Sequence, residues 1–492
     1  MTDTNWQPTF ADDAFQDGVG PKFRALAHMI RQAIRAGELA PGDRLPPMRD
    51  LAWRLQVTPG TVARAYQVVA AEGIVESHVG RGSFVAAQGA RQAPLQPLID
   101  DRNERGRDRP LRADEVAIDL RSPKLPDLGQ AGAIRQAFRR MADQSGEELL
   151  DYTPVSGDRD CTAALTDWIG PRAAGEFGPP DIVLTHGCQS AILLILSMCL
   201  AGERPRILCE ALCYPGLRHA ARLLRAEVAP VAQDGQGMLP DELDRAARQT
   251  GARVVFLTPS AQNPTTGRMN AERRAAIIDV ARRHDLQVIE DESYTTRPGA
   301  LRGADGPPPL RELAPERVWQ LVGLAKLLSA GLRFGAIICP TGMGGQARLA
   351  AQHSHFGVAR PLTVAVTELL RDPATEDLCR AILADFEARR NIATEVMAGT
   401  GLVSLAELPF LWLPLPARWR PSVYAQAAAD RGILVRPADE FAASAGSITL
   451  AGSFANAVRI GLAGHMPHAT LRRALTELRR LHDAPPQDDM VA

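Results

Sequence analysis

The chain of 492 residues lacks several features that would define its class. It has no CxxC pair, and its seven cysteines are odd in number and scattered, mostly within apolar runs. This pattern favours buried thiols over a disulfide framework or a zinc site. Its longest apolar run, 191–201, is too short to cross a bilayer, and its N-terminus is polar. We therefore expect a cytoplasmic protein with no membrane partner and no metal.

The chain also lacks an overall charge imbalance and is too long for a single core. The formal net charge is -1, so any contact with nucleic acid must come from a local patch. A chain of this length is expected to form at least two domains. The segment 87–117 is rich in Arg, Asp, Gln and Pro and has no apolar periodicity, which is typical of a linker. It separates a small domain, 18–86, from a large one, 118–485.

The small domain is predicted to be a winged helix-turn-helix. Apolar periodicity predicts helices over 22–36, 47–55 and 60–72, and two short strands over 74–77 and 83–85. Thr58 is placed as the N-cap of the third helix and Pro59 as its first residue. An ordinary helical subdomain is the alternative, but only a short turn separates the second and third helices. Nine Lys and Arg against five Asp and Glu between residues 22 and 85 give a local excess of positive charge.

The large domain is predicted to be α/β. Runs such as RPRILCE, ARVVFLT, LQVIED, RVWQLVG and RFGAIICP are short and apolar without alternation, which is typical of buried, largely parallel strands. Helical patterns, such as 270–284, lie between them. After about residue 370 the pattern changes to a long helix, 377–397, then strands and a final helix, 467–481, which predicts a smaller C-terminal lobe.

The residues of the small domain resemble those of the GntR-family winged helix. The resemblance runs through GELAPGDRLPPMRDLA, VTPGTVARAYQVVAAEGIVES and GRGSFV. It implies that Arg49 and Arg64 are the main cations facing DNA, with Thr61 and Arg81 in support. An arginine near the start of a recognition helix can reach a guanine edge or a phosphate.

The large domain contains an ordered set of residues suited to pyridoxal 5′-phosphate (PLP). Lys326 lies in VGLAKLLSAGLRFG, where an apolar setting makes a charged lysine costly unless it has a function. Asp291 ends an apolar strand and is followed by Tyr294 in IEDESY, while Asn263 lies in TPSAQNPTTG. A primary amine forms a Schiff base with the cofactor aldehyde, and a carboxylate keeps the pyridinium nitrogen protonated.

This domain resembles the fold-type I PLP enzymes of aminotransferase class I/II. The resemblance implies that Lys326 forms the internal aldimine, that Asp291 pairs with the ring nitrogen, and that Tyr294 and Asn263 donate to the phenolate oxygen. It further implies that Tyr214 stacks on the ring, and that Arg459 binds the carboxylate of a substrate or effector. The phosphate is expected to contact the backbone of Gly187 and Cys188 at a helix start, together with the side chains of Gln189 and Arg333.

Two segments and two single positions complete the resemblance. Tyr152 and Gly157, in DYTPVSGD, match a segment whose tyrosine reaches the phosphate of the partner subunit, and 119–127 matches the substrate entrance. Many relatives have hydroxyl residues where this chain has Gly323 and Ala325. At least one phosphate contact is therefore expected to be missing, which weakens PLP binding by about 1 kcal/mol per hydrogen bond.

Together the two domains resemble a MocR-type regulator of the GntR family. The resemblance implies a homodimer, head-to-tail, that binds operator DNA and senses an amino compound through an external aldimine. The large domain is then expected to act as a sensor and not as an enzyme. Two alternatives stay open: a working aminotransferase with an attached DNA-binding domain, and a regulator that has lost PLP and binds another ligand in the old pocket.

Overall fold

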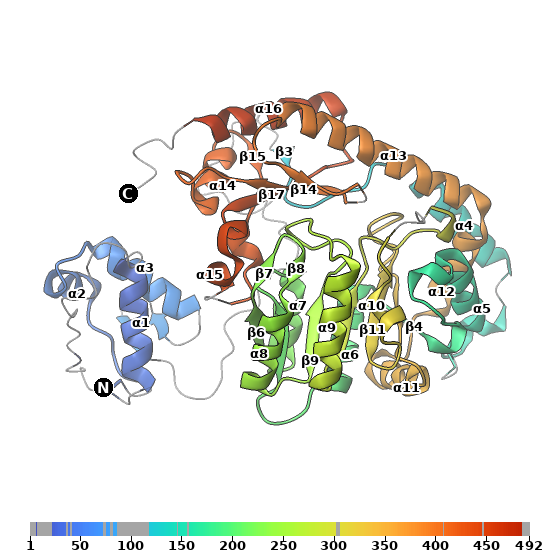
Figure 1. Cartoon of the computed structure of the whole chain (residues 1–492), viewed down its shortest axis with the longest axis horizontal. Helices are drawn as coiled ribbons and strands as arrows, with labels where there is room; N and C mark the ends of the chain where they lie inside the picture. Colours follow the sequence, from blue (N-terminus) through green and yellow to red (C-terminus); the bar gives the residue numbers. More distant parts are fainter. Residues whose placement is uncertain are drawn as a thin grey trace. The chain divides into compact units, whose positions relative to one another are not determined.

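The computed structural model divides into two compact units, Met1–Arg105 and Gly106–Ala492 (Figure 1). The structure describes residue 6 and residues 22–35, 38–39, 42–71, 75–78, 82–85, 118–144, 146–154, 157–301, 306–406, 408–444 and 447–484. The predicted linker, 87–117, lies outside these ranges, so the domain bounds expected from the sequence stay predictions.

The first unit is a winged helix-turn-helix. It contains α1 (Lys22–Arg35), α2 (Met48–Arg54), α3 (Pro59–Ala71) and an antiparallel hairpin of β1 (Val75–His78) and β2 (Gly82–Val85). The backbone N–H of Thr61 donates to Thr58 Oγ1 at 3.2 Å, which confirms Thr58 as the N-cap of α3. Leu26, Leu51 and Val62, one from each helix, are fully buried in a core that this unit forms by itself.

The surface of this unit carries cations and one large aromatic side chain. Arg49 and Arg64 are exposed, and the guanidinium carbon of Arg64 lies 4.6 Å from the ring centroid of Phe23. Trp53, on the same face of α2 as Arg49 because the two are four residues apart, is 77% exposed. The Trp53 indole therefore lies on the surface of the unit and is not part of its core.

The second unit is built on a seven-stranded sheet in the order β4-β12-β11-β10-β9-β5-β6. The strands are β4 (Ile182–Thr185), β5 (Arg206–Glu210), β6 (Glu227–Val231), β9 (Val254–Leu257), β10 (Gln287–Asp291), β11 (Val318–Gly323) and β12 (Gly335–Ile338). Six strands run in the same direction, as the unbroken apolar runs predict, while β12 runs in the opposite direction and pairs antiparallel with both β11 and β4. A strand that is buried on both faces is an apolar run whichever way it runs, so the sequence pattern could not predict the direction of β12.

Helices cover both faces of this sheet. Alternate residues of each strand face opposite sides, so Cys209 packs with α6 (Cys188–Cys199), α7 (Pro215–Leu223) and α11 (Gly344–His355). Its neighbour Leu208 packs on the other side with α8 (Pro240–Thr250) and α9 (Ala271–Arg283). The remaining helices before the C-terminal lobe are α4 (Gln130–Gln144), α5 (Arg159–Ile169), α10 (Leu310–Leu313) and α12 (Arg360–Arg371).

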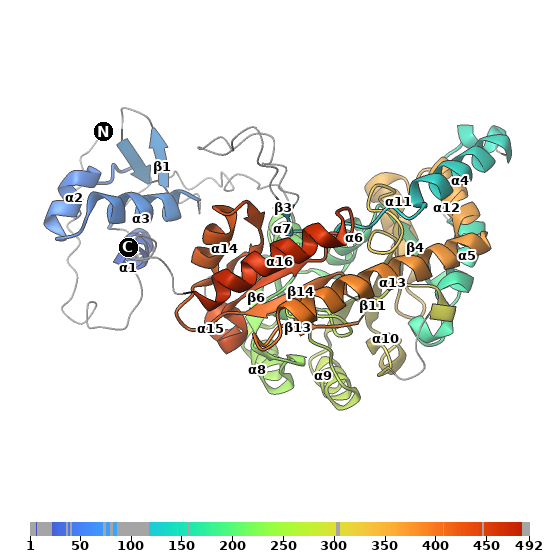
Figure 2. The ribbon, with the colours of Figure 1, turned by 90° about the horizontal axis from the view of Figure 1, so that it is seen from above.

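The C-terminal lobe contains an antiparallel sheet in the order β13-β14-β17-β16. Its elements are α13 (Pro373–Val396), β13 (Val403–Ser404), β14 (Phe410–Pro414), α14 (Pro421–Ala429), β15 (Ile433–Leu434), β16 (Arg436–Pro437), α15 (Ser447–Ala451), β17 (Ala457–Gly461) and α16 (His468–Asp483). Strand β15 pairs with β3 (Ile118–Asp119), and the hairpin strands β7 (Gln233–Asp234) and β8 (Gly237–Met238) belong to the large lobe. Helices α13 and α16 lie side by side (Figures 1 and 2).

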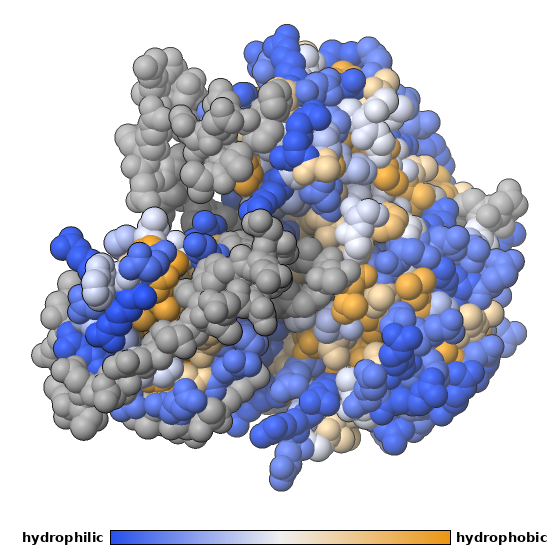
Figure 3. All heavy atoms as spheres, turned by 60° about the vertical axis from the view of Figure 1, so that its left-hand side comes forward, coloured by the Kyte–Doolittle hydropathy of each residue, from blue (hydrophilic) through white to orange (hydrophobic). Residues whose placement is uncertain are grey.

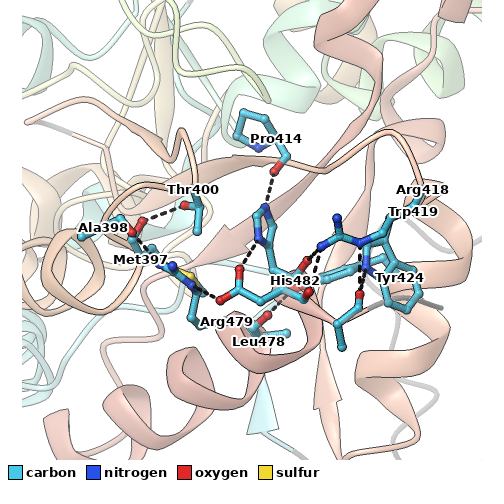
Figure 4. Close-up of polar contacts among 12 residues, drawn as sticks. Met397, Ala398, Thr400, Pro414, Arg418, Trp419, Tyr424, Leu478, Arg479 and His482 are labelled. Carbon is cyan, nitrogen blue, oxygen red and sulfur yellow. Dashed lines mark hydrogen bonds and ion pairs between the residues drawn. The ribbon is translucent and has the colours of Figure 1, made fainter. Parts of the chain in front are cut away.

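The end of α16 is fixed by side chains that cap its last carbonyl groups (Figure 4). Arg418 donates to the carbonyl oxygens of His482 at 2.8 Å and Asp483 at 3.0 Å, and Trp419 Nε1 donates to that of Ala484 at 3.0 Å. The buried His482 ring donates through Nε2 to the carbonyl of Pro414 at 3.3 Å. These bonds join α16 to β14 and to the loop before α14.

The described surface of the molecule is mixed in polarity. On the face shown in Figure 3, small hydrophobic patches alternate with hydrophilic side chains. Among the helices of the described ranges, none is long and apolar enough to cross a membrane.

Candidate cofactor site and nucleic-acid interface

The predicted cofactor residues gather at one edge of the seven-stranded sheet. Asp291 ends β10, Asn263 follows β9, Tyr214 follows β5, and Lys326 follows β11. The carboxyl ends of parallel strands meet at the same edge, where α/β folds bind their ligands. The Lys326 amine lies 5.1 Å from the ring centroid of Tyr294, so the lysine and the tyrosine are neighbours at this edge of the sheet.

Asp291 is a partly buried carboxylate with one short polar contact. Its Oδ1 accepts from the backbone N–H of Ser293 at 2.9 Å. Burial raises the pKa of Asp291, the neighbouring Glu292 raises it further, and Ser293 and Lys326 act in the opposite direction. A partly buried carboxyl with this environment is suited to pair with a cationic ring nitrogen, because that partner would relieve the desolvation cost.

An anion cradle forms where β4 leads into α6. Gly187 is the N-cap of α6 with φ of 83°, a conformation that favours glycine. The Arg333 side chain donates through Nη2 to the carbonyl of His186 at 3.2 Å, and a Cβ added at Gly187 would lie 3.0 Å from the same nitrogen. Backbone N–H groups at a helix start and a guanidinium at the same point fit a phosphate. The amide nitrogen of Gln189, expected to serve the phosphate, donates here to the carbonyl of Gly216 at 3.0 Å.

The thiol of Cys188 occupies the space that a side chain at position 323 would need. A Cβ added at Gly323 would lie 2.9 Å from Cys188 Sγ. The thiol itself donates to the carbonyl of Val322 at 3.6 Å, and burial raises its pKa to about 12, so it is neutral. The cysteine and the glycine are therefore packed against each other.

Tyr214 lies at the N-cap of α7 and is held close to the cradle. A Cβ added at Gly216 would lie 2.2 Å from Tyr214 Cε1 and 2.3 Å from Gln189 Oε1, so only glycine fits there. Burial raises the pKa of Tyr214, which keeps its hydroxyl neutral.

Arg459 is buried between two aromatic rings. Its guanidinium carbon lies 5.0 Å from the ring centroid of Phe410 and 4.8 Å from that of Phe441. It donates through Nη1 to Asn263 Oδ1 at 2.7 Å and through Nη2 to the carbonyl of Arg121 at 2.9 Å. Burial lowers its pKa to about 10, so the group stays charged at neutral pH. The contact with Asn263 brings the expected acid-group arginine into the same pocket as the other cofactor residues.

Glu210 supports this pocket and was not identified from the sequence. Its Oε2 accepts from Thr258 Oγ1 at 3.1 Å and from Gln262 Nε2 at 3.2 Å. These residues belong to the loop that carries Asn263, so the carboxyl positions that loop. Its place at the end of a buried strand was the only available signal, and that signal does not distinguish it from an ordinary strand-end residue.

In the first unit, the described DNA-facing candidates are Arg49, Thr61 and Arg64, while Arg81 lies outside the described residues. Arg49 lies on α2, and Thr61 and Arg64 lie in the first half of α3. The hydroxyl groups of Thr61 and the N-cap Thr58 lie 3.0 Å apart, so Thr61 is tied to the start of α3.

Two protein-family models match this chain, one over most of the large unit and one within the first unit. The model of the family described as aminotransferase class I and II matches residues 116–478, more than half of the chain. The chain belongs to this aminotransferase family. The model described as bacterial regulatory proteins, gntR family, matches residues 23–85. An aminotransferase-like domain joined to a GntR domain is the MocR-type arrangement, and the chain is a transcriptional regulator of this two-domain type.

Three curated relatives are similar to this aminotransferase-like regulator over 69% to 97% of its length. An uncharacterized HTH-type regulator of Bacillus subtilis, YdeF, is 26% identical and covers 97% of each chain. The vitamin B6 salvage pathway repressor PtsJ of Salmonella typhimurium is 27% identical over 85% of this chain and 90% of its own. The probable rhizopine catabolism regulator MocR of Rhizobium meliloti is 28% identical over 69% of this chain and 70% of its own.

Solved structures share the fold of the large unit. An archaeal alanine:glyoxylate aminotransferase superposes with a TM-score of 0.65 at 22% identity, covering 74% of this chain and 90% of its own. Aspartate aminotransferase of Thermus thermophilus gives 0.60 at 19% identity, with 75% and 92% covered. This fold is one that generally depends on PLP, and the partly buried carboxyl of Asp291 and the cradle at Gly187 fit that cofactor.

Proposed function

We propose that the chain is a PLP-dependent transcriptional regulator that holds operator DNA in the cytoplasm and senses a small amino compound. The observation that carries this proposal is the gathering of Lys326, Asp291 and Asn263 at one sheet edge in a chain that also has a winged helix-turn-helix. The name of PtsJ ties one relative to vitamin B6, which supports PLP as the ligand.

Different residues of the site would bind different parts of the cofactor. Lys326 would hold the aldehyde carbon, Asp291 the ring nitrogen, and Tyr294 and Asn263 the phenolate oxygen, with Tyr214 stacked on the ring. Gly187, Cys188, Gln189 and Arg333 would hold the phosphate. When bound, PLP would supply an aldehyde that reacts with primary amines, such as the amine of Lys326 or that of an effector.

Arg459 would connect the effector to the shape of the pocket. An acid group on the effector would bind the Arg459 guanidinium, which now donates to Asn263 and to the carbonyl of Arg121. Exchange of these bonds for bonds to a ligand would favour one arrangement of the loops over another. A ligand that binds one arrangement better shifts the equilibrium toward it, and the DNA-binding units would follow.

We also propose a head-to-tail homodimer. Tyr152, 78% exposed, stacks on Phe356, 61% exposed, with ring centroids 5.2 Å apart, and the adjacent Leu150 is 87% exposed. Exposed apolar side chains of this size are typical of interfaces. In the dimer Tyr152 would reach the phosphate of the partner subunit.

The test measures operator binding with DNA from the protein's own upstream region, with and without PLP. Wild type, Lys326→Ala and Arg64→Ala are compared by footprinting. We expect PLP to change the footprint of wild type but not that of Lys326→Ala, and we expect Arg64→Ala to weaken binding and to lower the salt slope by about one unit. Identical binding of wild type and Lys326→Ala under all conditions, including a panel of amino compounds, would overturn the sensor role.

A working aminotransferase is the second candidate. Lys326, Asp291 and Arg459, the groups such an enzyme needs, are all kept and lie near one another. Multiple turnovers with an amino donor and a keto acid, lost in Lys326→Ala, would support this enzyme. A single half-reaction without turnover would support the sensor.

A further inference from the structure

Three neighbouring residues of the C-terminal sheet form a row next to the pocket. Arg459 on β17 lies directly opposite Trp412 on β14 and directly opposite Arg436 on β16, and both pairings are antiparallel. Residues directly opposite each other in an antiparallel pair project from the same face of the sheet. The row therefore places two guanidinium groups and an indole on one face.

Each of the three side chains has a buried N–H group without a hydrogen-bond acceptor. These are Trp412 Nε1, Arg459 Nε and Arg436 Nε. Arg436 Nε lies 3.3 Å from Glu440 Oε2 as an ion pair, but without the alignment of a hydrogen bond. Buried donors are almost always paired, so the two unpaired donors, Trp412 Nε1 and Arg459 Nε, beside the poorly aligned contact of Arg436 Nε, point to an acceptor that binds there.

The three groups converge on one ring. The guanidinium carbons of Arg459 and Arg436 lie 4.8 Å and 5.9 Å from the ring centroid of Phe441, and Trp412 meets the same ring edge-on at 6.4 Å. After burial, the charge of Arg436 is among the causes that lower the pKa of Arg459. Two cations held this close repel each other unless an anion lies between or beside them.

We propose that Arg436 binds a second acid group, so that the amino compound sensed by this chain is an amino dicarboxylate. Arg459 takes one carboxylate and Arg436 takes the other. The inference rests on the proposed function only for the place of the amino group at Lys326. The two acid groups are recognised by side chains of the chain itself.

The carboxylate of Glu440 competes with a ligand carboxylate for the guanidinium of Arg436. Its side chain is 48% exposed, whereas that of Arg436 is 16% exposed, so the carboxylate can swing into water while the guanidinium stays. A ligand carboxylate replaces it at Arg436. Without a ligand, this ion pair offsets one of the two positive charges.

The test uses acids without an amino group, on protein free of PLP. Calorimetry compares glutarate, which has two carboxylates, with butyrate, which corresponds to glutarate with its second carboxylate replaced by a hydrogen atom. Wild type is compared with Arg436→Met and with Arg420→Met, which removes an exposed arginine of the same lobe. We expect glutarate to bind wild type at least about tenfold more tightly than butyrate, the range of a charged hydrogen bond.

Arg436→Met should abolish that preference, while Arg420→Met should keep it. Glu440→Gln should tighten glutarate binding and leave butyrate unchanged, because the competing carboxylate is removed. Circular dichroism and thermal unfolding confirm that each variant is folded. Equal affinities for the two acids, no binding of either acid, or equal losses of both in Arg436→Met would overturn the proposal.

A second arm separates this proposal from the PLP-sensor function. PLP-loaded protein is titrated with glutamate and with norvaline, its analogue with one carboxylate, while the visible absorbance of the cofactor is followed. A stronger response to glutamate that depends on Arg436 supports both proposals. Arg436-dependent binding of glutarate without any response to glutamate would leave the anion site standing and count against the sensor.

Discussion

Cys188 and Gly323 pack against each other, so the absence of a side chain at residue 323 makes room for the thiol. The thiol occupies the position from which a hydroxyl at residue 323 would approach the cradle. The phosphate contact that we expect to be missing at residue 323 is therefore linked to the packing of Cys188. A neutral thiol is a weak donor, so the cradle depends more on its backbone and on Arg333.

Restoring the hydroxyl should require removing the thiol. Gly323→Ser alone forces a contact below 3.0 Å and is expected to destabilise the protein by about 1–3 kcal/mol. The double variant Cys188→Ala, Gly323→Ser should recover that stability and bind PLP several-fold more tightly, because one hydrogen bond contributes about 1 kcal/mol. Urea unfolding and PLP titration measure the two effects. Additive effects of the two substitutions would contradict the packed-pair description.

Glu210 should make stability depend on pH. Burial raises its pKa from 4.5 to about 7, so between these values the folded chain holds a proton that the unfolded chain has lost. The contribution of Glu210 to stability therefore falls as pH rises from 4.5 through 7. Glu210→Gln keeps the acceptor oxygen without the charge, so its stability relative to wild type should increase by about 2–3 kcal/mol from pH 5 to pH 8. Parallel pH profiles of urea unfolding would rule out this role.

The sequence identified residue types but not their partners. Lys326, Asp291 and Asn263 could be predicted because each stands at the end of a recognisable strand or in a marked turn. Arg436 and Glu210 could not, because LVRPADEF and RILCE have no spacing that relates them to residues far along the chain. The bond between Arg459 and Asn263 joins positions 196 residues apart, and only the assembled sheets bring them together.

At the level of elements, the helices were predictable to within a few residues and the strand directions were not. The long helix begins at Pro373, four residues before the predicted start, because Asp372 accepts from the N–H of Ala374 at 3.0 Å and Pro373 is the first helical residue. The predicted helix 270–284 matches α9, where Asn270 is the N-cap. The direction of β12 depends on its connection after β11, which apolar content does not encode.

One arginine contributes to the docking of α16 in addition to the buried leucines along this helix. Arg418 donates to three carbonyl groups at the end of this helix, those of residues 482, 483 and 484. Arg418→Ala leaves these groups without that partner and is expected to lower the free energy of unfolding by about 1–3 kcal/mol. Arg420→Ala, the exposed neighbour, should change it by less than about 0.5 kcal/mol. Chemical denaturation followed by circular dichroism measures both, and equal effects would contradict the capping role.

For the whole molecule, the main feature is that the two units have separate cores. The core formed by Leu26, Leu51 and Val62 contains no residue of the large unit. Cooperative unfolding follows shared cores, so we expect the two units to unfold independently.

Calorimetry of the full chain should therefore show two transitions. A fragment of residues 1–105 should reproduce the smaller one and bind the same DNA as the full chain, although without any response to PLP. Lys326→Ala should leave the smaller transition unchanged. A single transition that no fragment reproduces would show that the units unfold together.

The exposed Trp53 has a practical consequence. Of the six tryptophans, Trp319, Trp412 and Trp419 are 1% exposed and Trp6 and Trp168 are 8% exposed, while Trp53 is 77% exposed. An aqueous collisional quencher such as iodide would quench the fluorescence of Trp53 at lower concentrations than it quenches the fluorescence of the five shielded tryptophans. Its fluorescence therefore gives the regulator a built-in optical reporter on the helix that carries Arg49, through which operator contact can be followed without a dye.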